Sequence, residues 1–387
     1  MVIGIPKEIM QDERRVSATP ETVALMVKDN LTVLIERSAG EGSYYSDAQY
    51  TDAGAQVIDD VAEIYSRADI ILKVKEPQFN NAKQCSEVDM MHTGQCLITF
   101  IHPASPANHD MVKALAAKGV TALTLDGVPR ISRAQKMDAL TSMSTAAGYK
   151  GMLMAINELT VFAPPIGSAV GMIKPINVLV IGAGVAGLQA IATAKRMGAV
   201  VKTVDIRPDA AEQGKSLGAG IIETGVPSEI ALGQGGYANA LPDEWLKKEH
   251  EALKSTVSQS DVVFCSALIP NRLAPILVTE EMVKTMKPGS VLVDVSIDQG
   301  GNCPLTVPGE TVIKHGVTLI GIKNIPGQLP TSATWMFSKN MYGLLKYLLK
   351  DGKMTLDESD EVIQGILTTN GGKVVHAGAL EAMEEKT

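Results

Sequence analysis

The sequence predicts an α/β protein built from two Rossmann-like, doubly wound parallel-sheet domains joined by a long helix. Two observations carry this prediction. Short runs of Val, Ile and Leu alternate with helical patterns in both halves of the chain, which is typical of parallel sheets. The chain has 387 residues, of which 45% are hydrophobic, so it can form two ordinary domains, each with its own core.

The first half alternates strands and helices from its start. The expected elements, in order, are strands 2–5 and 31–37 with helix 20–29 between them, strands 68–74 and 96–102, helix 106–119 and strand 120–125. A stretch rich in Ala, Met, Leu and Ser without proline then runs from about Arg133 to Leu159. This stretch predicts one helix that bridges the two domains.

The second half repeats the pattern after a proline-containing loop at 161–175. Its expected strands lie within 177–181, 200–207, 261–270, 290–297 and 317–322. A helix over 332–352 follows Pro330, and by analogy with the fold we expect it to pack back on the first domain. We therefore expect an N-terminal domain of residues 1–137 plus 330–387 and a dinucleotide-binding domain of residues 138–329.

Charge and cysteine usage exclude several classes of protein. The formal net charge of −8 argues against nucleic acid or anionic lipid as partners, since phosphates require a basic face. The four cysteines show no metal-ligand spacing, which indicates a reducing compartment and no metal. The N-terminus does not resemble a signal peptide, and no apolar run reaches the roughly 20 residues of a membrane span. We expect a cytoplasmic protein that does not insert into the membrane directly.

A glycine-rich turn is the strongest local motif. Gly182, Gly184 and Gly187 follow a strand and open an apolar helix. In the dinucleotide-binding fingerprint the first glycine makes the tight turn, the second lets the backbone approach a pyrophosphate, and the third allows close helix–strand packing. Asp205, 18 residues past Gly187, ends the next strand, where a carboxylate accepts both ribose hydroxyls of NAD and repels a 2′-phosphate. Arg207 can weaken this preference because it can pair a 2′-phosphate. The alternative is a purely structural turn.

Four polar residues follow strands of the predicted sheets, namely Arg15, Lys75, His102 and Asp298. Ligands of open parallel sheets bind at the carboxyl ends of strands. The four together suit an oxo-acid: the arginine binds a carboxylate, the lysine polarises a carbonyl, and the histidine and aspartate transfer protons. Singly, each has a structural alternative, in which His102 is a packed polar residue, Lys75 pairs with Glu76 and Asp298 caps a turn.

Three further motifs resemble the alanine dehydrogenase and pyridine nucleotide transhydrogenase family over essentially the whole chain. The run from Pro129 to Gly151 resembles the NAD-contacting loop and linker helix of the transhydrogenase NAD(H)-binding component. The segment from Pro208 to Ser260 resembles a mobile loop of the family, and the run from Gly300 to Leu305 is the third match. Without the resemblance, Arg130 and Arg133 are equally typical of a solvated helix start, and Gly235–Tyr237 of a flexible turn.

The resemblance implies a set of site residues. It assigns Arg130, Gln135 and Asp138 to the nicotinamide end, where they position hydride transfer, and Tyr237 to the closing loop. The implied NAD(H)-contacting positions are Gly182, Ala183, Gly184, Val185, Gly187, Asp205, Ile206, Arg207, Gly236, Tyr237 and Leu268, with Arg130, Gln135 and Asp138. Leu268 otherwise looks like a core residue.

The resemblance also implies activity and partners. We expect the NAD(H)-binding component of a proton-translocating transhydrogenase, which exchanges hydride between NADH and NADP⁺ held by a partner. Separate membrane-spanning and NADP-binding subunits would then recruit a homodimer of this chain to the inner membrane. Lys75, His102 and Asp298 match the catalytic motifs of alanine dehydrogenases, so NAD-dependent reductive amination of pyruvate, with Arg15 and Lys75 on the carboxylate, is the alternative. A nucleotide-sensing protein without catalysis is a third possibility.

Overall fold

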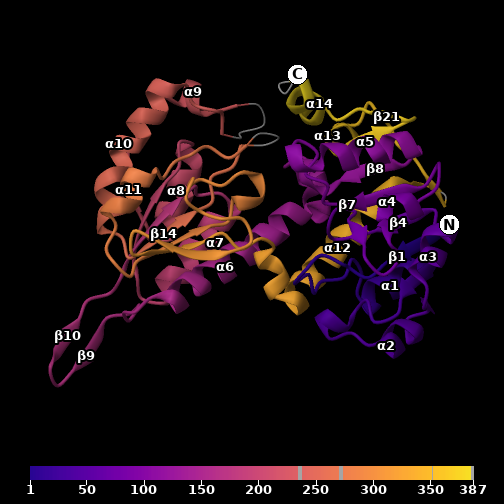
Figure 1. Cartoon of the computed structure of the whole chain (residues 1–387), viewed down its shortest axis with the longest axis horizontal. Coiled ribbons are helices and arrows are strands. Elements are labelled where there is room, and N and C mark those ends of the chain that lie inside the picture. Colours follow the sequence, from indigo (N-terminus) through magenta and orange to yellow (C-terminus); the bar gives the residue numbers. More distant parts are fainter. Residues whose placement is uncertain (234–237, 270–272, 351, 385–387) are drawn as a thin grey trace. The chain divides into compact units, whose positions relative to one another are not determined.

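The computed structural model describes residues 1–233, 238–269, 273–350 and 352–384. The chain forms two units, Met1–Met143 with Pro326–Thr387 (unit 1) and Ser144–Ile325 (unit 2). Each unit is built around one sheet, as Figure 1 shows. The predicted α/β class with two mostly parallel sheets is confirmed. The described helices include none that is both long and apolar enough to cross a bilayer.

The sheet of unit 1 has eight strands in the order β21-β20-β8-β7-β4-β1-β2-β3. Their bounds are β1 (Val2–Ile5), β2 (Thr32–Glu36), β3 (Gln56–Ile58), β4 (Ile70–Leu72), β7 (Cys96–Thr99), β8 (Thr121–Thr124), β20 (Leu367–Asn370) and β21 (Lys373–Val374). The strands from β1 to β8 pair in parallel, whereas β20 pairs antiparallel to both β8 and β21. The C-terminal segment thus extends the predicted parallel sheet with antiparallel strands that the sequence pattern did not predict.

Helices and short hairpins complete unit 1. The helices are α1 (Pro20–Lys28), α2 (Asp47–Asp52), α3 (Val61–Arg67), α4 (Glu87–Met90), α5 (His109–Lys118), α12 (Pro330–Leu348), α13 (Glu361–Ile366) and α14 (Ala377–Glu384). The hairpins are β5 (Phe79–Asn80) with β6 (Cys85–Ser86) and β18 (Leu349–Lys350) with β19 (Lys353–Met354). Short 3-10 helices cover η1 (Glu41–Ser43), η2 (Pro106–Asn108), η3 (Leu125–Gly127) and η4 (Ser132–Met137).

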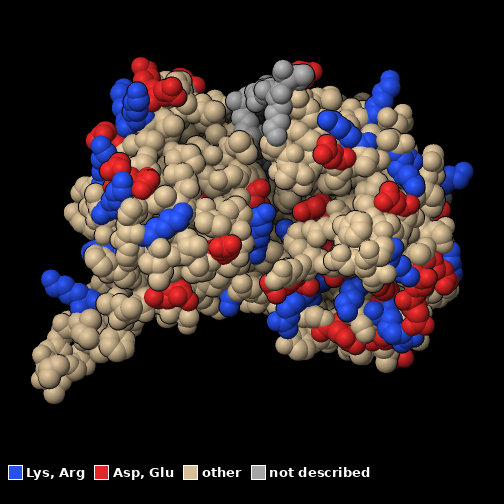
Figure 2. Space-filling model, viewed as in Figure 1, with Lys and Arg blue, Asp and Glu red and all other residues tan. Residues whose placement is uncertain are grey.

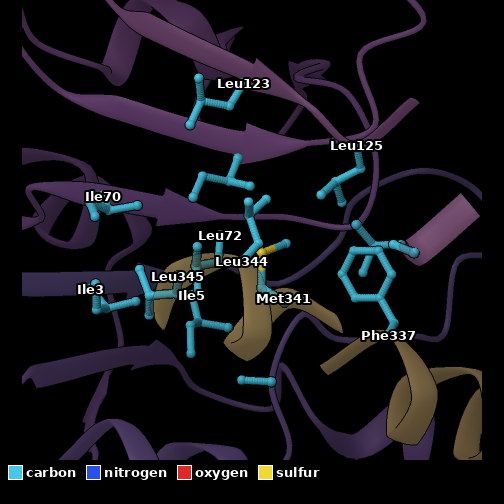
Figure 3. Close-up of a cluster of buried hydrophobic side chains, with 14 of the residues drawn as sticks. Ile3, Ile5, Ile70, Leu72, Leu123, Leu125, Phe337, Met341, Leu344 and Leu345 are labelled. Atoms are coloured by element: carbon cyan, nitrogen blue, oxygen red, sulfur yellow. The ribbon is translucent and has the colours of Figure 1, made fainter. Parts of the chain in front are cut away.

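The helix expected after Pro330 is α12, and it belongs to unit 1 as predicted. Phe337, Met341 and Leu344 on α12 are completely buried. They pack in one cluster with Ile5 and Leu72 of the sheet, which Figure 3 shows in close-up. Apolar residues at three- and four-residue spacing form one face of a helix, and this face covers the sheet.

The predicted single helix over Arg133–Leu159 is wrong at its start. Residues Ser132–Met137 form the 3-10 helix η4, and α6 begins only at Ala139 and ends at Glu158. Asp138 stands between them and its carboxylate accepts the Thr141 backbone N–H (2.8 Å) and hydroxyl (2.6 Å). A carboxylate at this position satisfies an amide of the first turn, so Asp138 caps α6 and separates the two helical segments.

The sheet of unit 2 has seven strands in the order β13-β12-β11-β14-β15-β17-β16. The strands are β11 (Asn177–Ile181), β12 (Val200–Val204), β13 (Gly220–Ile221), β14 (Val262–Cys265), β15 (Val291–Asp294), β16 (Thr311–Lys314) and β17 (Val317–Ile320). All neighbours pair in parallel except β16, which is antiparallel to β17. The further elements are α7 (Val185–Arg196), α8 (Pro208–Ser216), α9 (Ser228–Ala231), α10 (Asp243–Gln259), α11 (Glu280–Thr285), η6 (Ile297–Gln299) and η7 (Ile325–Gln328).

Two segments of unit 2 differ from expectation. The predicted loop 161–175 contains a hairpin of β9 (Ile166–Ser168) and β10 (Gly171–Ile173), whose tip carries no charged side chains in Figure 2. The segment Pro208–Ser260 is largely helical, since α8, α9 and α10 occupy much of it. The expectation of one long loop there is wrong because α10 buries Leu253 and Val257 against the sheet.

Candidate nucleotide and acid–base sites

The glycine-rich turn lies at the carboxyl end of β11, in the middle of the unit 2 sheet. Gly182 has φ +89°, a conformation that side chains other than glycine rarely adopt. A Cβ on Gly187 would lie 1.8 Å from the Gly182 carbonyl oxygen. Gly184 is the N-cap of α7 and offers no side-chain acceptor to the first amides of that helix. The turn therefore has the close packing and the exposed helix N-terminus of a phosphate-binding loop.

The strand order places this turn at a topological switch point. β11 is flanked by β12 on one side and β14 on the other. The chain leaves β11 toward β12 and later crosses back to β14, so the connections diverge at the carboxyl end of β11. Ligands of doubly wound sheets bind at such a point.

Asp205 follows β12 beside the turn, and both its oxygens are engaged. Oδ2 accepts the Ala183 backbone N–H at 2.8 Å. Arg207 donates from Nε to Oδ1 (2.9 Å) and from Nη2 to Oδ2 (2.8 Å). Asp205 thus holds the glycine-rich turn directly, and the arginine that the sequence left open as a phosphate ligand pairs with this carboxylate.

The loop after β14 completes this side of unit 2. The Ser266 hydroxyl donates to the Gly182 carbonyl oxygen at 2.9 Å. A Cβ on Gly182 would lie 2.9 Å from the Ala267 nitrogen, so the two loops are in direct contact. Leu268 is 37% exposed, which excludes the core alternative for this residue. Val185 and Ile206 are half-buried beside the turn.

Asn302 fixes the loop after β14, a role that the sequence did not indicate. It is completely buried. Its Oδ1 accepts the Ala267 N–H at 3.0 Å, and its Nδ2 donates to the carbonyl oxygens of Ala267 (2.9 Å) and Pro275 (2.8 Å). The Asp294 carboxylate in turn accepts the Asn302 backbone N–H at 2.7 Å. The run from Gly300 to Leu305 therefore supports the nucleotide loop from behind.

The residues expected at the nicotinamide end belong to unit 1. Arg130 and Gln135 are exposed, and Asp138 is half-buried while it caps α6. Arg133, the neighbouring arginine, bonds to Asp360 (3.0 Å) and Glu361 (3.0 Å) and so anchors α13. Gly236 and Tyr237 lie outside the described residues.

Three of the four strand-end residues come together in unit 1. Arg15 is buried and its guanidinium is paired with Glu13 at 2.6 Å (Nη2–Oε2) and 2.8 Å (Nε–Oε1). Lys75 is only 7% exposed, and its positive charge acts on both Glu13 and His102. Asp298, the fourth, lies in η6 of unit 2, in a turn closed by the Gly300 N–H on the Ile297 carbonyl oxygen.

His102 is oriented by an aspartate that the sequence pattern did not single out. Its Nδ1 lies 2.7 Å from Asp126 Oδ1, and its backbone N–H donates to Oδ2 at 2.8 Å. Burial lowers the pKa of His102, but the Asp126 carboxylate outweighs it, so the net shift is upward. Asp126 directly follows the strand next to the one that ends before His102, and this adjacency was the available signal.

A doubly wound sheet with a glycine-lined turn at its switch point and an acid on the neighbouring strand defines a nucleotide-binding α/β protein. Family models described as alanine dehydrogenase/PNT, N-terminal domain and C-terminal domain match residues 4–147 and 151–377. The chain belongs to this alanine dehydrogenase/PNT family.

Full-length relatives fall in both branches of the family. The chain is 40% identical to the first of the separately encoded pieces of NAD(P) transhydrogenase subunit alpha of Rhodospirillum rubrum, over 97% of this chain and 98% of that protein. A transhydrogenase structure from Sinorhizobium meliloti matches with a TM-score of 0.80 and 34% identity, covering 97% of this chain and 99% of the other. An L-alanine dehydrogenase structure matches with a TM-score of 0.81 and 29% identity, covering all of both chains.

Proposed function

We propose that the chain is the NAD(H)-binding alpha subunit component of a proton-translocating NAD(P) transhydrogenase. The observation that carries the proposal is the 40% identity to the R. rubrum alpha subunit component over nearly the full length of both proteins. The glycine-rich turn and Asp205 supply the nucleotide site that this activity requires. When bound, NADH supplies the hydride that NADP⁺ on a partner subunit accepts.

The proposed roles follow the positions of the residues. The first amides of α7 bind the pyrophosphate, which Gly184 admits, and Asp205 accepts the ribose hydroxyls while Arg207 yields some of its pairing. Arg130, Gln135 and Asp138 orient the nicotinamide end, and we retain residues 138–329 as the NAD(H)-binding domain. Hydride exchange between nicotinamides needs no general acid or base, so positioning and exclusion of water are the contributions of the protein.

The proposal includes partners. A subunit of this kind requires membrane-spanning and NADP-binding subunits, and these would hold it at the cytoplasmic face of the inner membrane. We further propose a homodimer. The β9–β10 hairpin offers apolar side chains for such contact, since Val170 is 98% and Met172 78% exposed, and large exposed apolar residues together are typical of interfaces.

Alanine dehydrogenase activity is the second candidate, and one observation favours it. Arg15, Lys75 and His102 lie in unit 1 with their charges coupled through Glu13 and Asp126. A carboxylate-binding arginine beside a lysine and an oriented histidine suits addition of ammonia to an oxo-acid, in which protons must be moved. Hydride exchange between nucleotides has no use for such a set.

One assay separates the candidates. The purified chain is mixed with NADH, pyruvate and ammonium, and NADH absorbance is followed. An NADP-binding transhydrogenase component is then added with an NADP analogue, and its reduction is followed. We expect no NADH loss in the first step and hydride transfer in the second. Rapid NADH loss with pyruvate and ammonium alone would establish the alanine dehydrogenase, and binding without either reaction would indicate a nucleotide sensor.

A further inference from the structure

Glu249 on α10 is a buried carboxyl group that none of the roles assigned above uses. Only 4% of the residue is exposed. Leu253 and Val257 follow it at four-residue intervals, so the three side chains leave one face of the helix. Both apolar residues are completely buried in a cluster that includes Val204 of β12. The Glu249 side chain therefore points into the layer between α10 and the unit 2 sheet.

Helix geometry places Glu249 at the carboxyl edge of that sheet. The chain passes from α10 into β14 through Ser260 and Asp261 only, so α10 runs antiparallel to the strands. Glu249 stands about 15 Å before the helix end at Gln259, at roughly 1.5 Å per residue. β14 spans about 13 Å, and its last residue is level with Val204, since both pair with Ile181. Glu249 thus reaches the level of Asp205.

The charges around Glu249 leave Asp205 as its electrostatic neighbour. Burial, and then the negative charge of Asp205, raise the pKa of Glu249 to about 7. Within residues 1–233, 238–269, 273–350 and 352–384, no hydrogen bond to the Glu249 carboxyl is found. Arg207 bonds to Asp205 with two nitrogens, so it is the nearby cation that offsets this acidic pair.

Other ionisable groups near α10 are engaged elsewhere. On α11, which packs against α10, Lys284 pairs with both Glu280 and Glu281 at the surface. His250 of α10 bonds to the Ile276 carbonyl oxygen. The strand β11 has no ionisable side chain. The acidic pair of Asp205 and Glu249 is therefore a local feature of the nucleotide side of unit 2.

We propose that Glu249 is a second acidic determinant at the adenosine end of the nucleotide site, where together with Asp205 it selects NAD(H) over NADP(H). The proposal rests on the proposed function, which places the adenosine ribose at Asp205. An unmodified ribose brings hydroxyl donors that a carboxylate accepts. A 2′-phosphate brings up to about two negative charges, which an ionised Glu249 repels in addition to Asp205.

The test measures nucleotide preference as a function of pH. Dissociation constants of NADH and NADPH are determined by nucleotide fluorescence at pH 6 and pH 8 for the full chain, E249Q and E251Q. At pH 8, E249Q is expected to lose about tenfold of the preference for NADH, whereas at pH 6 it should resemble the original protein. The control E251Q removes the same charge from the exposed face of α10 and should change nothing.

Each other result has a defined meaning. Because phosphate titrates near pH 6 itself, the proteins are compared with one another at each pH. An unchanged preference in E249Q at pH 8 overturns the proposal. If E249Q does not fold, as judged by circular dichroism, the unaltered chain is titrated from pH 7 to 8.5, where its preference for NADH must rise several-fold; a constant ratio again overturns the proposal. Failure of the unaltered chain to bind NADH at all would instead overturn the proposed function.

Discussion

His102 and Asp126 form a buried ion pair in unit 1, with Nδ1 and Oδ1 2.7 Å apart. The second oxygen of the same carboxylate accepts the His102 backbone N–H at 2.8 Å. One aspartate thus fixes both the ring and the backbone of a histidine that has a positive φ of 49°. A histidine held in this way keeps one ring nitrogen on the carboxylate and has the other available for proton transfer.

Asp126→Asn is expected to lower the pKa of His102, because the carboxylate is the group that raises it. The folded-state pKa of His102 is raised, so the pair stabilises the fold fully below the unfolded pKa of about 6.5 and ceases to do so as pH rises through the folded value. The loss in unfolding free energy should be about 2 kcal/mol at pH 6 and smaller at pH 9. NMR titration of His102 and urea unfolding measure both effects. The exposed Asp110→Asn serves as control, and an unshifted His102 titration would contradict the prediction.

Gly187→Ala is expected to abolish NADH binding, because the added Cβ would lie 1.8 Å from the Gly182 carbonyl oxygen. Relief requires the turn or α7 to move, which should cost about 3 kcal/mol of unfolding free energy. Gly220→Ala is the matched control, since a Cβ there meets its nearest neighbour at 3.6 Å. Fluorescence titration with NADH and thermal unfolding are the measurements. NADH binding of normal strength in Gly187→Ala would rule out this turn as the phosphate site.

The neighbouring arginines 130 and 133 should behave differently. Arg130→Ala is expected to slow hydride transfer about tenfold or more in the reconstituted assay, because the proposed function places it at the nicotinamide end. Arg133 pairs with Asp360 and Glu361 at the surface, so Arg133→Ala should lower stability by less than about 1 kcal/mol and leave transfer intact. Equal effects of the two substitutions on transfer would show that neither is specific.

Asn302→Asp is expected to destabilise unit 2 by about 3 kcal/mol and to weaken NADH binding. The Nδ2 group donates to two backbone carbonyl oxygens, at Ala267 and Pro275, and a carboxylate oxygen cannot donate there. The new charge would also lie close to the Asp294 carboxylate, which already binds the Asn302 backbone N–H. The control Asn81→Asp makes the same change at an exposed position. Urea unfolding detects the loss, and equal stability of both variants would refute the supporting role.

Glu8→Gln is expected to flatten the dependence of stability on pH. Burial raises the pKa of Glu8 to about 7 even though Lys73 lies 3.3 Å away. A raised carboxyl pKa adds stability below the unfolded value of about 4.5, and this stability is lost as pH rises toward 7. The variant should therefore match or exceed the original protein at pH 8, by about 1 kcal/mol. Urea unfolding at pH 5 and 8 measures this, with Glu41→Gln as an exposed control. An equal loss of stability at both pH values would contradict it.

Local patterns in the sequence were sufficient for the fold class and for the phosphate loop. The run from Val178 to Gly187 specifies a strand, a turn and a helix through residues that are neighbours in the chain, and the periodicity of apolar residues reports which face is buried. The same applies to α12, whose apolar spacing predicted a packed helix. Patterns failed where a single residue interrupts them, as at Asp138, whose carboxylate ends one helical segment and caps the next.

Tertiary structure decided which polar groups meet. Asp126 with His102, Ser266 with Gly182, and Glu249 with Asp205 lie far apart in the sequence, and only the strand order brings their elements together. The same is true of β20, which joins the sheet beside β8 although the two strands are remote in the chain, with the Thr369 hydroxyl on the Val120 carbonyl oxygen. Periodicity reports burial, which each residue experiences individually. Hydrogen bonds and ion pairs depend on the distance between two groups, and for groups that are remote in the chain that distance is set by the packed sheet alone.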